Sequence, residues 1–306
     1  MKIIFFGTPP IAAQVLEALI KRGIEVIAVV TKQDKPRGRT LQPLFSAVKE
    51  LVLSKYPTLP LLQPNKVSTP QFQEELDQFK ADLFVVFAYG EIIKSNILKL
   101  PLHGCINLHP SLLPKFRGPS PLHYTLLSGE KMGGVTVIEM SLEMDAGDIL
   151  AQESFSIPPD MNMGSLEEIV IPLGSQLLFD VITQYQRKLQ HKVKQDPHQV
   201  TFAPFIRKEM LQIKWDRKAE EIHHQVRAFS PAPGAWSYVE IKGKRQRLKI
   251  LKAELTSKSP IYQGDEWVVR CGEGCLSILE LQLEGKKRVG ISDFIRGNSC
   301  SPLLLA

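Results

Sequence analysis

An amide, an imidazole and a carboxylate stand close enough in the sequence to form a small acid–base site. Asn107 and His109 are two residues apart at the end of an apolar stretch, and Asp145 follows in the acidic segment 144–148. Side chains two apart on a strand point to the same face of a sheet. In α/β enzymes, catalytic side chains gather at the carboxyl ends of strands. We therefore predict that Asn107, His109 and Asp145 form a metal-free catalytic site.

Other kinds of site find little support in the sequence. Cys271 and Cys275 have no second cysteine pair and no histidine at ligand spacing, and His223 and His224 are adjacent, so their side chains diverge on a helix. The segment 6–10 lies at a first strand-to-helix turn but lacks the G-x-G-x-x-G glycines that admit a pyrophosphate. We predict no metal, no nucleotide cofactor and no Ser or Cys nucleophile.

Length and composition indicate a globular protein of two domains. The chain has 306 residues, of which 43% are hydrophobic and 23% charged. The first residues are too short an apolar stretch for a signal peptide, and no run approaches the roughly 18 apolar residues of a membrane span. Four cysteines do not make a disulfide framework. We expect a cytoplasmic protein that does not enter a membrane.

Strand-like and helix-like stretches alternate over the first 155 residues. The apolar run 83–88 is typical of a central strand covered on both faces, and 104–109 predicts the strand that carries the candidate site. This order predicts a doubly wound, Rossmann-like and mostly parallel sheet. Residues 165–189 predict a helical stretch interrupted by Pro172 and Gly174, and the polar run 190–200 predicts a linker.

Short alternating strands dominate the sequence after Trp236 and predict a small OB-like β-barrel. We expect a catalytic domain over 1–189, a linker over 190–205 and the barrel domain over 206–306. Charge follows the same division. Residues 1–205 hold 20 Lys/Arg and 20 Asp/Glu, whereas residues 206–306 hold 18 and 12. The whole excess of +6 therefore lies in the C-terminal part, which indicates contact with a polyanion.

Two further segments lie near the expected carboxyl edge of the sheet. The loop 31–39 carries four cations and one anion, and its position favours a binding role over that of a plain solvated loop. Residues 87–90 end the central strand with two aromatic residues and a glycine. These aromatic side chains could either cover a flat ligand or belong to the core.

With these motifs in place, the chain resembles the folate-dependent formyltransferases nearly end to end. The resemblance is carried by the segments Gly7-Thr8-Pro9, 34–39, Ala88-Tyr89-Gly90, 107–114, 117–121, 145–148 and 227–236. Asn-x-His with Ser-Leu-Leu-Pro is shared across that family. The Gly-Thr-Pro start, the basic loop and the β-rich C-terminal part are similar to its tRNA-modifying members. The chain departs from them at Thr40-Leu41, where many relatives have Gly or Lys.

The resemblance implies transfer of a formyl group from 10-formyltetrahydrofolate to the α-amino group of methionine on initiator methionyl-tRNA. In that reaction, Asn107 and protonated His109 would donate hydrogen bonds to the formyl oxygen as negative charge develops on it. Asp145 would orient His109 and favour its protonated form, while a nearby water removes the amine proton. The group that finally accepts this proton stays open.

The resemblance also implies where the two substrates bind a monomeric enzyme. Folate would lie against Phe87, Ala88, Tyr89, Gly90, Ser111, Leu112, Leu113 and Pro114. The tRNA would contact Lys35, Arg37, Arg39, Lys242, Lys244, Arg245, Arg247 and Lys249.

Three alternative functions remain open at this level. A formyltransferase for a sugar-nucleotide amine and a 10-formyltetrahydrofolate hydrolase would both keep Asn107, His109 and Asp145. A small substrate, however, does not need the cations clustered at 32–39. A non-catalytic RNA-binding protein has no need of the intact catalytic set.

Overall fold

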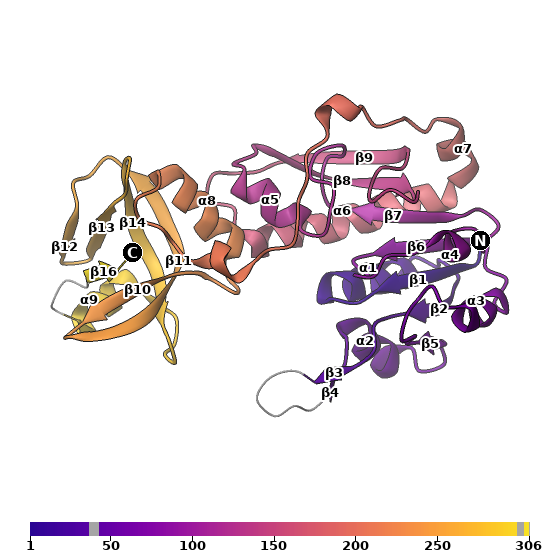
Figure 1. Ribbon diagram of the computed structural model, residues 1–306, viewed down its shortest axis with the longest axis horizontal. Coiled ribbons are helices and arrows are strands. Elements are labelled where there is room, and N and C mark those ends of the chain that lie inside the picture. The colour runs from indigo at the N-terminus through magenta and orange to yellow at the C-terminus, as the bar shows by residue number, and fades with distance from the viewer. Residues whose placement is uncertain (37–42, 299–302, 306) are drawn as a thin grey trace. The chain divides into compact units, whose positions relative to one another are not determined.

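The computed structural model describes residues 1–36, 43–298 and 303–305, and it divides into two compact units (Figure 1). The first unit comprises Met1–Pro121, Gly133–Phe155 and Glu167–Ala203. The second comprises Leu122–Met132, Ser156–Leu166 and Pro204–Ala306. The expected boundaries at 189 and 206 stay a prediction; in the structure, two short stretches before residue 167 already belong to the second unit.

A seven-stranded sheet forms the centre of the first unit, in the order β5-β2-β1-β6-β7-β8-β9. Its strands are β1 (Ile3–Gly7), β2 (Val26–Val30), β5 (Leu61–Leu62), β6 (Leu83–Phe87), β7 (Cys105–His109), β8 (Met132–Glu139) and β9 (Ile149–Ser156). The pairs from β5 through to β7 are parallel, whereas β8 runs antiparallel to β7. The strand order reverses direction between β1 and β6, which is where open α/β sheets bind ligands. The predicted mostly parallel sheet is thus confirmed.

Two helices of the first unit begin at a capping side chain. The helices of this unit are α1 (Pro10–Lys21), α2 (Ala47–Lys55), α3 (Pro70–Asp77), α4 (Ser95–Leu98), most of α6 (Met163–Thr183) and α7 (Tyr185–Gln190). Ser46 and Thr69 cap α2 and α3 by accepting hydrogen bonds from first-turn N–H groups. Helix α1 buries Val15, Leu16 and Leu19 on one face, and this spacing is typical of an amphipathic helix.

The prediction of an interrupted helix near Pro172 is wrong, because α6 runs unbroken through that residue. Gly174 lets α6 lie close to β7 just beyond this proline: a Cβ on it would come within 2.8 Å of Leu108 Cδ2 in β7. Close packing of α6 against β7 therefore requires the glycine. Leu108 lies between Asn107 and His109, so this contact fixes the strand that carries both candidate catalytic side chains.

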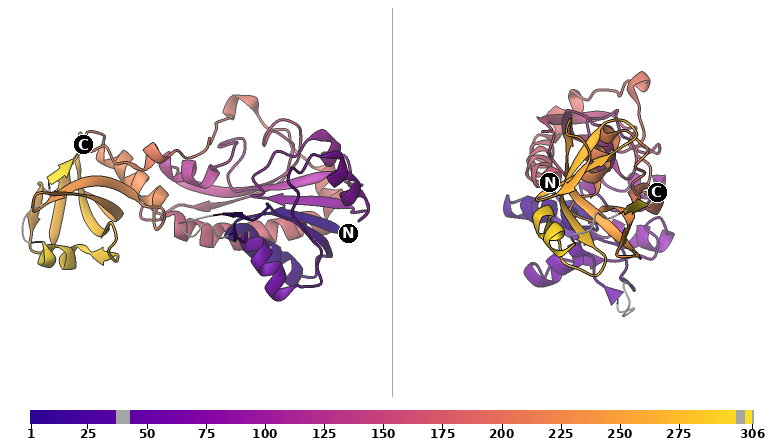
Figure 2. Two further views of the ribbon diagram at one scale, coloured as in Figure 1. Left: turned by 60° about the horizontal axis from the view of Figure 1, so that its bottom comes forward. Right: turned by 90° about the vertical axis from the view of Figure 1, so that its left-hand side faces the viewer.

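The second unit contains an antiparallel sheet in the order β12-β13-β14-β11-β10-β16. Its strands are β10 (Ala235–Ile241), β11 (Lys244–Thr256), β12 (Ile261–Gln263), β13 (Glu266–Arg270), β14 (Cys275–Leu283), β15 (Val289–Gly290), which pairs with β14, and β16 (Leu303–Leu305). In Figure 2 the sheet is strongly curved, and its inner face holds a core that includes Phe229, Leu248, Trp267 and Leu276. The helices of this unit include α5 (Pro121–Leu127), α8 (Ala219–Phe229) and α9 (Ile291–Gly297), and the short helix η2 (Lys208–Leu211) precedes α8.

A two-residue turn joins β10 to β11. Lys242 and Gly243 have φ values of +52° and +71°, and the flanking residues Ile241 and Lys244 pair with each other. Positive φ at both central residues defines a type I′ turn, whose twist matches that of the strands. This turn sets the β10–β11 register and hence which side chains face outward.

The expected linker at 190–200 is not free of the first unit. Val193 pairs with Ile149, Phe202 pairs with Arg117, and a short helix, η1 (Pro197–Gln199), lies between them. The polar composition of this segment therefore did not indicate that it packs on the first unit, because hydrogen bonds rather than apolar contacts hold it.

A small hairpin, β3 (Lys35–Pro36) with β4 (Pro43–Leu44), flanks the undescribed part of the basic loop. Across the described residues, no helix combines the length and hydrophobicity needed to cross a bilayer.

Candidate active site

Strand β7 brings Asn107 and His109 to the carboxyl edge of the parallel part of the sheet. Asn107 pairs with Val86 of β6 on one side and with Ile138 of β8 on the other, and His109 pairs with Thr136. His109 is only 3% exposed, and Asn107 is partly buried. The local sequence produces this placement, because the strand ends at His109, directly before Pro110.

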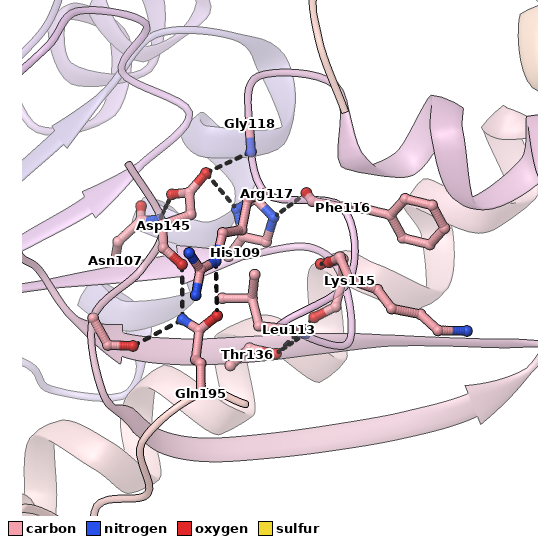
Figure 3. Close-up of polar contacts among 12 residues, drawn as sticks. Asn107, His109, Leu113, Lys115, Phe116, Arg117, Gly118, Thr136, Asp145 and Gln195 are labelled. Atoms are coloured by element: carbon pink, nitrogen blue, oxygen red, sulfur yellow. Dashed lines mark hydrogen bonds and ion pairs between the residues drawn. The ribbon is translucent and has the colours of Figure 1, made fainter. Parts of the chain in front are cut away.

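Asp145 lies beside both side chains and completes the group (Figure 3). Asn107 Nδ2 donates to Asp145 Oδ1 at 3.4 Å, and His109 Nδ1 lies 3.5 Å from Oδ2. The Gly118 N–H donates a shorter bond to the same Oδ2, at 2.8 Å. The structure thus brings together the three residues that the sequence selected as catalytic.

The turn that carries Asp145 has no room to change shape. Asp145 has φ +52°, a left-handed conformation that costs a non-glycine residue about 1–2 kcal/mol. A Cβ on Gly147 would lie 1.6 Å from the Glu139 carbonyl oxygen, so only glycine fits there. The Glu139 N–H also donates to the Asp148 carbonyl at 2.9 Å. These contacts hold the turn against the end of β8.

Two opposing effects act on the His109 imidazole. Its Nε2 lies 2.9 Å from the Phe116 carbonyl oxygen, while Nδ1 faces the Asp145 carboxylate. Both acceptors favour the protonated ring. Burial has the larger effect, however, and it lowers the pKa of His109 below its usual value despite Asp145 and Phe116. Proton uptake at this ring would therefore create a buried ion pair with Asp145.

Asn107 retains the capacity to bind a ligand. A side-chain amide has two N–H donors, and the one bond described uses only one of them. Both ring nitrogens of His109, by contrast, already face protein oxygens. A hydrogen bond from His109 to a substrate oxygen requires one of these contacts to open. The geometry consequently makes Asn107 the readier oxyanion donor and His109–Asp145 the pair suited to holding a proton.

Several residues that support the site were missed by sequence reasoning. Gln195 donates to the carbonyls of Asp145 and Gly147 at 2.7 and 2.8 Å and accepts from Arg117 Nε at 3.0 Å. Thr201 Oγ1 accepts from the Phe116 N–H at 2.9 Å. Gln195 and Thr201 follow Asp145 in sequence by fifty or more positions within a polar run. Only tertiary structure could place them here.

The segment 111–114, expected to bind folate, is fixed by β8 and β9. Thr136 Oγ1 donates to the Ser111 carbonyl at 2.6 Å and accepts from the Leu113 N–H at 3.2 Å. Gln152 Nε2 donates to the Leu113 carbonyl at 3.0 Å. Ser111 and Leu113 are buried, whereas Leu112 and Pro114 are partly exposed. This segment therefore presents a rigid backbone beside His109.

The other expected folate segment, 87–90, has its two aromatic side chains in the core. Phe87 and Tyr89 are 1% and 2% exposed, and Tyr89 packs edge-on against Phe6. Ala88, with φ +49°, and Gly90 are exposed instead. Any ligand contact at this strand end comes from the backbone and from Ala88 and Gly90, not from the rings.

The expected tRNA-binding loop is only partly visible. Arg37 and Arg39 lie outside the described residues, and Lys35 is placed only as part of β3. The start of the loop is anchored, because Asp34 accepts from Lys49 Nζ at 2.5 Å and from Gln63 Nε2 at 3.0 Å. The bond from Lys49 keeps the pKa of Asp34 below its usual value.

Three of the cations expected to bind tRNA, on β11, lie beside two aromatic side chains of β10 that were not among the expected binding residues. Arg245 lies over the Tyr238 ring at 3.9 Å, and Arg247 lies over the Trp236 ring at 4.1 Å. Lys249 pairs with Trp236 across the strands. We call Trp236, Tyr238, Arg245, Arg247 and Lys249 the arginine–aromatic face. Lys242 and Lys244 are exposed at the adjoining turn.

Within the described ranges, no three His, Cys, Asp or Glu side chains are grouped as metal ligands.

Comparison with known proteins identifies relatives over the whole chain. A family model described as formyl transferase matches residues 1–182, and one described as formyl transferase, C-terminal domain, matches residues 205–299. The methionyl-tRNA formyltransferase of Protochlamydia amoebophila (strain UWE25) is 42% identical over 310 residues, which cover 99% of this chain and 97% of that protein. The methionyl-tRNA formyltransferase of Caldanaerobacter subterraneus subsp. tengcongensis is 38% identical, covering 98% and 97%.

Solved structures with the same fold are more distant in sequence. An N-formyltransferase from Helicobacter canadensis, in complex with folinic acid and dTDP-3-aminofucose, aligns with a TM-score of 0.64 at 20% identity over 94% of this chain and all of that one. HypX from Aquifex aeolicus, in complex with tetrahydrofolic acid, aligns with a TM-score of 0.63 at 18% identity over 96% of this chain and 47% of that one.

The tight turn at Gly147 leads to a prediction about stability. Gly147→Ala should destabilise the first unit by about 1–3 kcal/mol, because the added methyl group must push the Glu139 carbonyl away. Gly297→Ala is the matched control, since a Cβ there meets nothing within 4 Å. Thermal unfolding of both variants measures the difference. Equal midpoints for Gly147→Ala and wild type would show that the turn is not constrained.

Proposed function

The chain belongs to the formyl transferase family, and on that basis we propose that it is a methionyl-tRNA formyltransferase. It transfers the formyl group of 10-formyltetrahydrofolate to the α-amino group of methionine on initiator methionyl-tRNA. The observation that carries this proposal is the full-length similarity, 38–42% identical, to proteins of that name, combined with the close contact of Asn107, His109 and Asp145.

The reaction exchanges one carbon–nitrogen bond for another. The amine nitrogen attacks the formyl carbon, a tetrahedral intermediate carries the negative charge on oxygen, and the bond to N10 of the folate then breaks. The amine loses one proton and N10 gains one. The protein must therefore stabilise an oxyanion and relay a proton, and it needs no covalent intermediate.

Asn107 provides the first of these functions. Its remaining N–H can donate to the developing oxyanion, while its bond to Asp145 fixes the orientation of the amide. His109 and Asp145 provide the second. Protonation of His109 Nδ1 turns the 3.5 Å contact with Asp145 Oδ2 into an ion pair, so this pair can hold the amine proton until N10 receives it.

The folate is bound between rigid backbone segments. The fixed carbonyls and N–H groups near Ser111 and Leu113 suit the polar edge of a pterin, and Leu112 and Pro114 supply apolar contact. Gly134 supports this arrangement, because a Cβ there would lie 2.2 Å from Leu112 Cδ2. At residues 87–90, Ala88 and Gly90 supply the contact rather than the buried rings.

The tRNA is bound by cations on both units. The loop that includes Lys35, Arg37 and Arg39 is assigned to the acceptor end, next to the reacting amine. The arginine–aromatic face, with Lys242 and Lys244, is assigned to the sugar–phosphate backbone. Stacked guanidinium groups are held in place by the rings yet remain free to bind phosphate oxygens at their edges. The proposal also includes a monomeric, cytoplasmic enzyme, since aminoacylated initiator tRNA is used in the cytoplasm.

A transfer assay with three acceptors tests the proposed function. Purified protein with 10-formyltetrahydrofolate should formylate initiator methionyl-tRNA and leave free methionine and amino-sugar nucleotides unchanged. Formylation of the sugar nucleotide, or release of formate without transfer, would assign the chain to the sugar-modifying or hydrolase alternatives. Binding of tRNA with no formyl turnover would indicate a non-catalytic RNA-binding protein.

Asn107→Ala tests the oxyanion donor. We expect kcat to fall by about 100- to 1000-fold with little change in folate affinity, because the lost bond forms only as charge develops. Asn96→Ala is the control, since Asn96 bonds to Ser68 and Gln73 on the surface of the first unit. Wild-type turnover in Asn107→Ala would remove this residue from the mechanism.

The double variant Arg245→Ala/Arg247→Ala tests the arginine–aromatic face. The KM for tRNA should rise by about tenfold or more at low salt, while the KM for folate stays the same, because phosphate contacts are electrostatic. The dependence of tRNA binding on salt should also become shallower. Lys286→Ala/Lys287→Ala is the control, since these exposed lysines lie between β14 and β15. An unchanged salt slope in the arginine variant would exclude this face.

A further inference from the structure

The segment 191–203 of the first unit packs beside the candidate site with few buried apolar side chains of its own. Val193 and Phe202 are 61% and 68% exposed, and only Ala203 at the end is fully buried. Between 191 and 199, Gln195 is the sole residue that is not exposed. The packing of this segment within the first unit therefore depends on particular hydrogen bonds and on the ion pairs of Lys192 with Glu139 and Asp148 rather than on hydrophobic burial.

Gln195 makes three of these bonds with its side-chain amide. Its Nε2 donates to the Asp145 carbonyl at 2.7 Å and to the Gly147 carbonyl at 2.8 Å. A primary amide has two N–H groups, and both are engaged here. Its Oε1 accepts from Arg117 Nε at 3.0 Å. Figure 3 shows the Gln195 amide between Arg117 and the loop that carries Asp145.

Arg117 closes a ring of contacts around the catalytic carboxylate. Its backbone N–H donates to the Thr201 carbonyl at 2.9 Å, and its carbonyl accepts from the Ala203 N–H at 2.7 Å. The next residue, Gly118, donates its N–H to Asp145 Oδ2. Gln195 thus holds the backbone carbonyl of Asp145. Gly118 holds the Asp145 side chain, and Gln195 also bonds to Arg117, the residue before Gly118.

This ring decides where the carboxylate points. The left-handed backbone at Asp145 is a costly conformation, so it persists only while its surroundings hold it. The contact from Oδ2 to His109 is already long, at 3.5 Å, and that from Oδ1 to Asn107 is 3.4 Å. A small shift of the turn would break both, and misplacement of catalytic groups by about 1 Å can cost on the order of 100-fold in rate.

We propose that Gln195 is a positioning residue for the transfer reaction: by holding the carbonyls of Asp145 and Gly147, it keeps the Asp145 carboxylate directed at Asn107 and His109. The role rests on the proposed function and deepens it. Gln195 acts through the Asp145 turn, because both of its N–H donors are used on the carbonyls of Asp145 and Gly147.

Two substitutions of matched size test this role. Gln195→Glu replaces the amide donor with an oxygen that repels both carbonyls, and Gln195→Met removes the donors without adding charge. We expect kcat to fall by about 10- to 100-fold in both, with KM for folate and for tRNA within about threefold of wild type. Gln199→Glu is the control, because Gln199 lies in the same segment and bonds only to Asp196 among the described contacts of its side chain.

The pH profile separates positioning from general loss of structure. Asp145 raises the pKa of His109 against the effect of burial. Once the carboxylate moves away, the pKa of His109 falls further. In Gln195→Met, the part of the kcat–pH profile that depends on His109 should therefore move to lower pH. In Gln199→Glu it should not move. Circular dichroism at the assay temperature establishes that each variant is folded.

Several outcomes would overturn the proposal. The first is that the folded variants keep wild-type kcat and an unchanged kcat–pH profile. The second is that only the KM for tRNA changes. The third is that neither variant folds, in which case Gln195 contributes to stability only. A wild-type protein that does not formylate methionyl-tRNA would instead refute the proposed function, and the two failures are therefore distinguishable.

Discussion

The carboxylate of Asp145 is the group on which the arrangement of the site depends. It accepts hydrogen bonds from Asn107 and from the backbone of Gly118, and it faces His109. These partners come from β7 and from the loop after it, whereas Asp145 comes from a turn between β8 and β9. A partly buried carboxylate without partners would be costly, so the local conformations of all these segments are coupled through it.

The strained turn and the strand edge contribute in different ways. Strand β7 is held by its neighbours β6 and β8 and by the packing of Leu108 against Gly174, so it gives Asn107 and His109 fixed positions. The turn 145–147 is not itself part of the sheet. The hydrogen bond from the Glu139 N–H to the Asp148 carbonyl ties its end to β8, the absence of a side chain at Gly147 lets it lie close to Glu139, and the hydrogen bonds of Gln195 hold its backbone. The Asp145 carboxylate thus joins a rigid strand to a turn that is held by hydrogen bonds.

Much of the fold could be predicted because its signals are local. The apolar run 83–88 predicted β6, and the alternation of strand-like and helix-like stretches predicted the mostly parallel sheet. The errors occurred where packing outweighed local preference. Helix α6 continues through Pro172 and packs closely against β7 at Gly174, and the polar run after residue 190 is docked because its partners are backbone carbonyls far away in sequence.

By itself, the sequence determined the chemistry of the site: residue type and a spacing of two placed Asn107 and His109 on one face of a strand, and the motifs around them indicated formyl transfer. The excess of basic residues after 205 is likewise a property of sequence alone. Only the tertiary structure decided that Asp145 reaches both partners, that Phe87 and Tyr89 belong to the core, and that Gln195 holds the catalytic turn. The physical reason is that hydrogen bonds and burial join residues many positions apart, and a sequence read locally contains no record of which distant groups will meet.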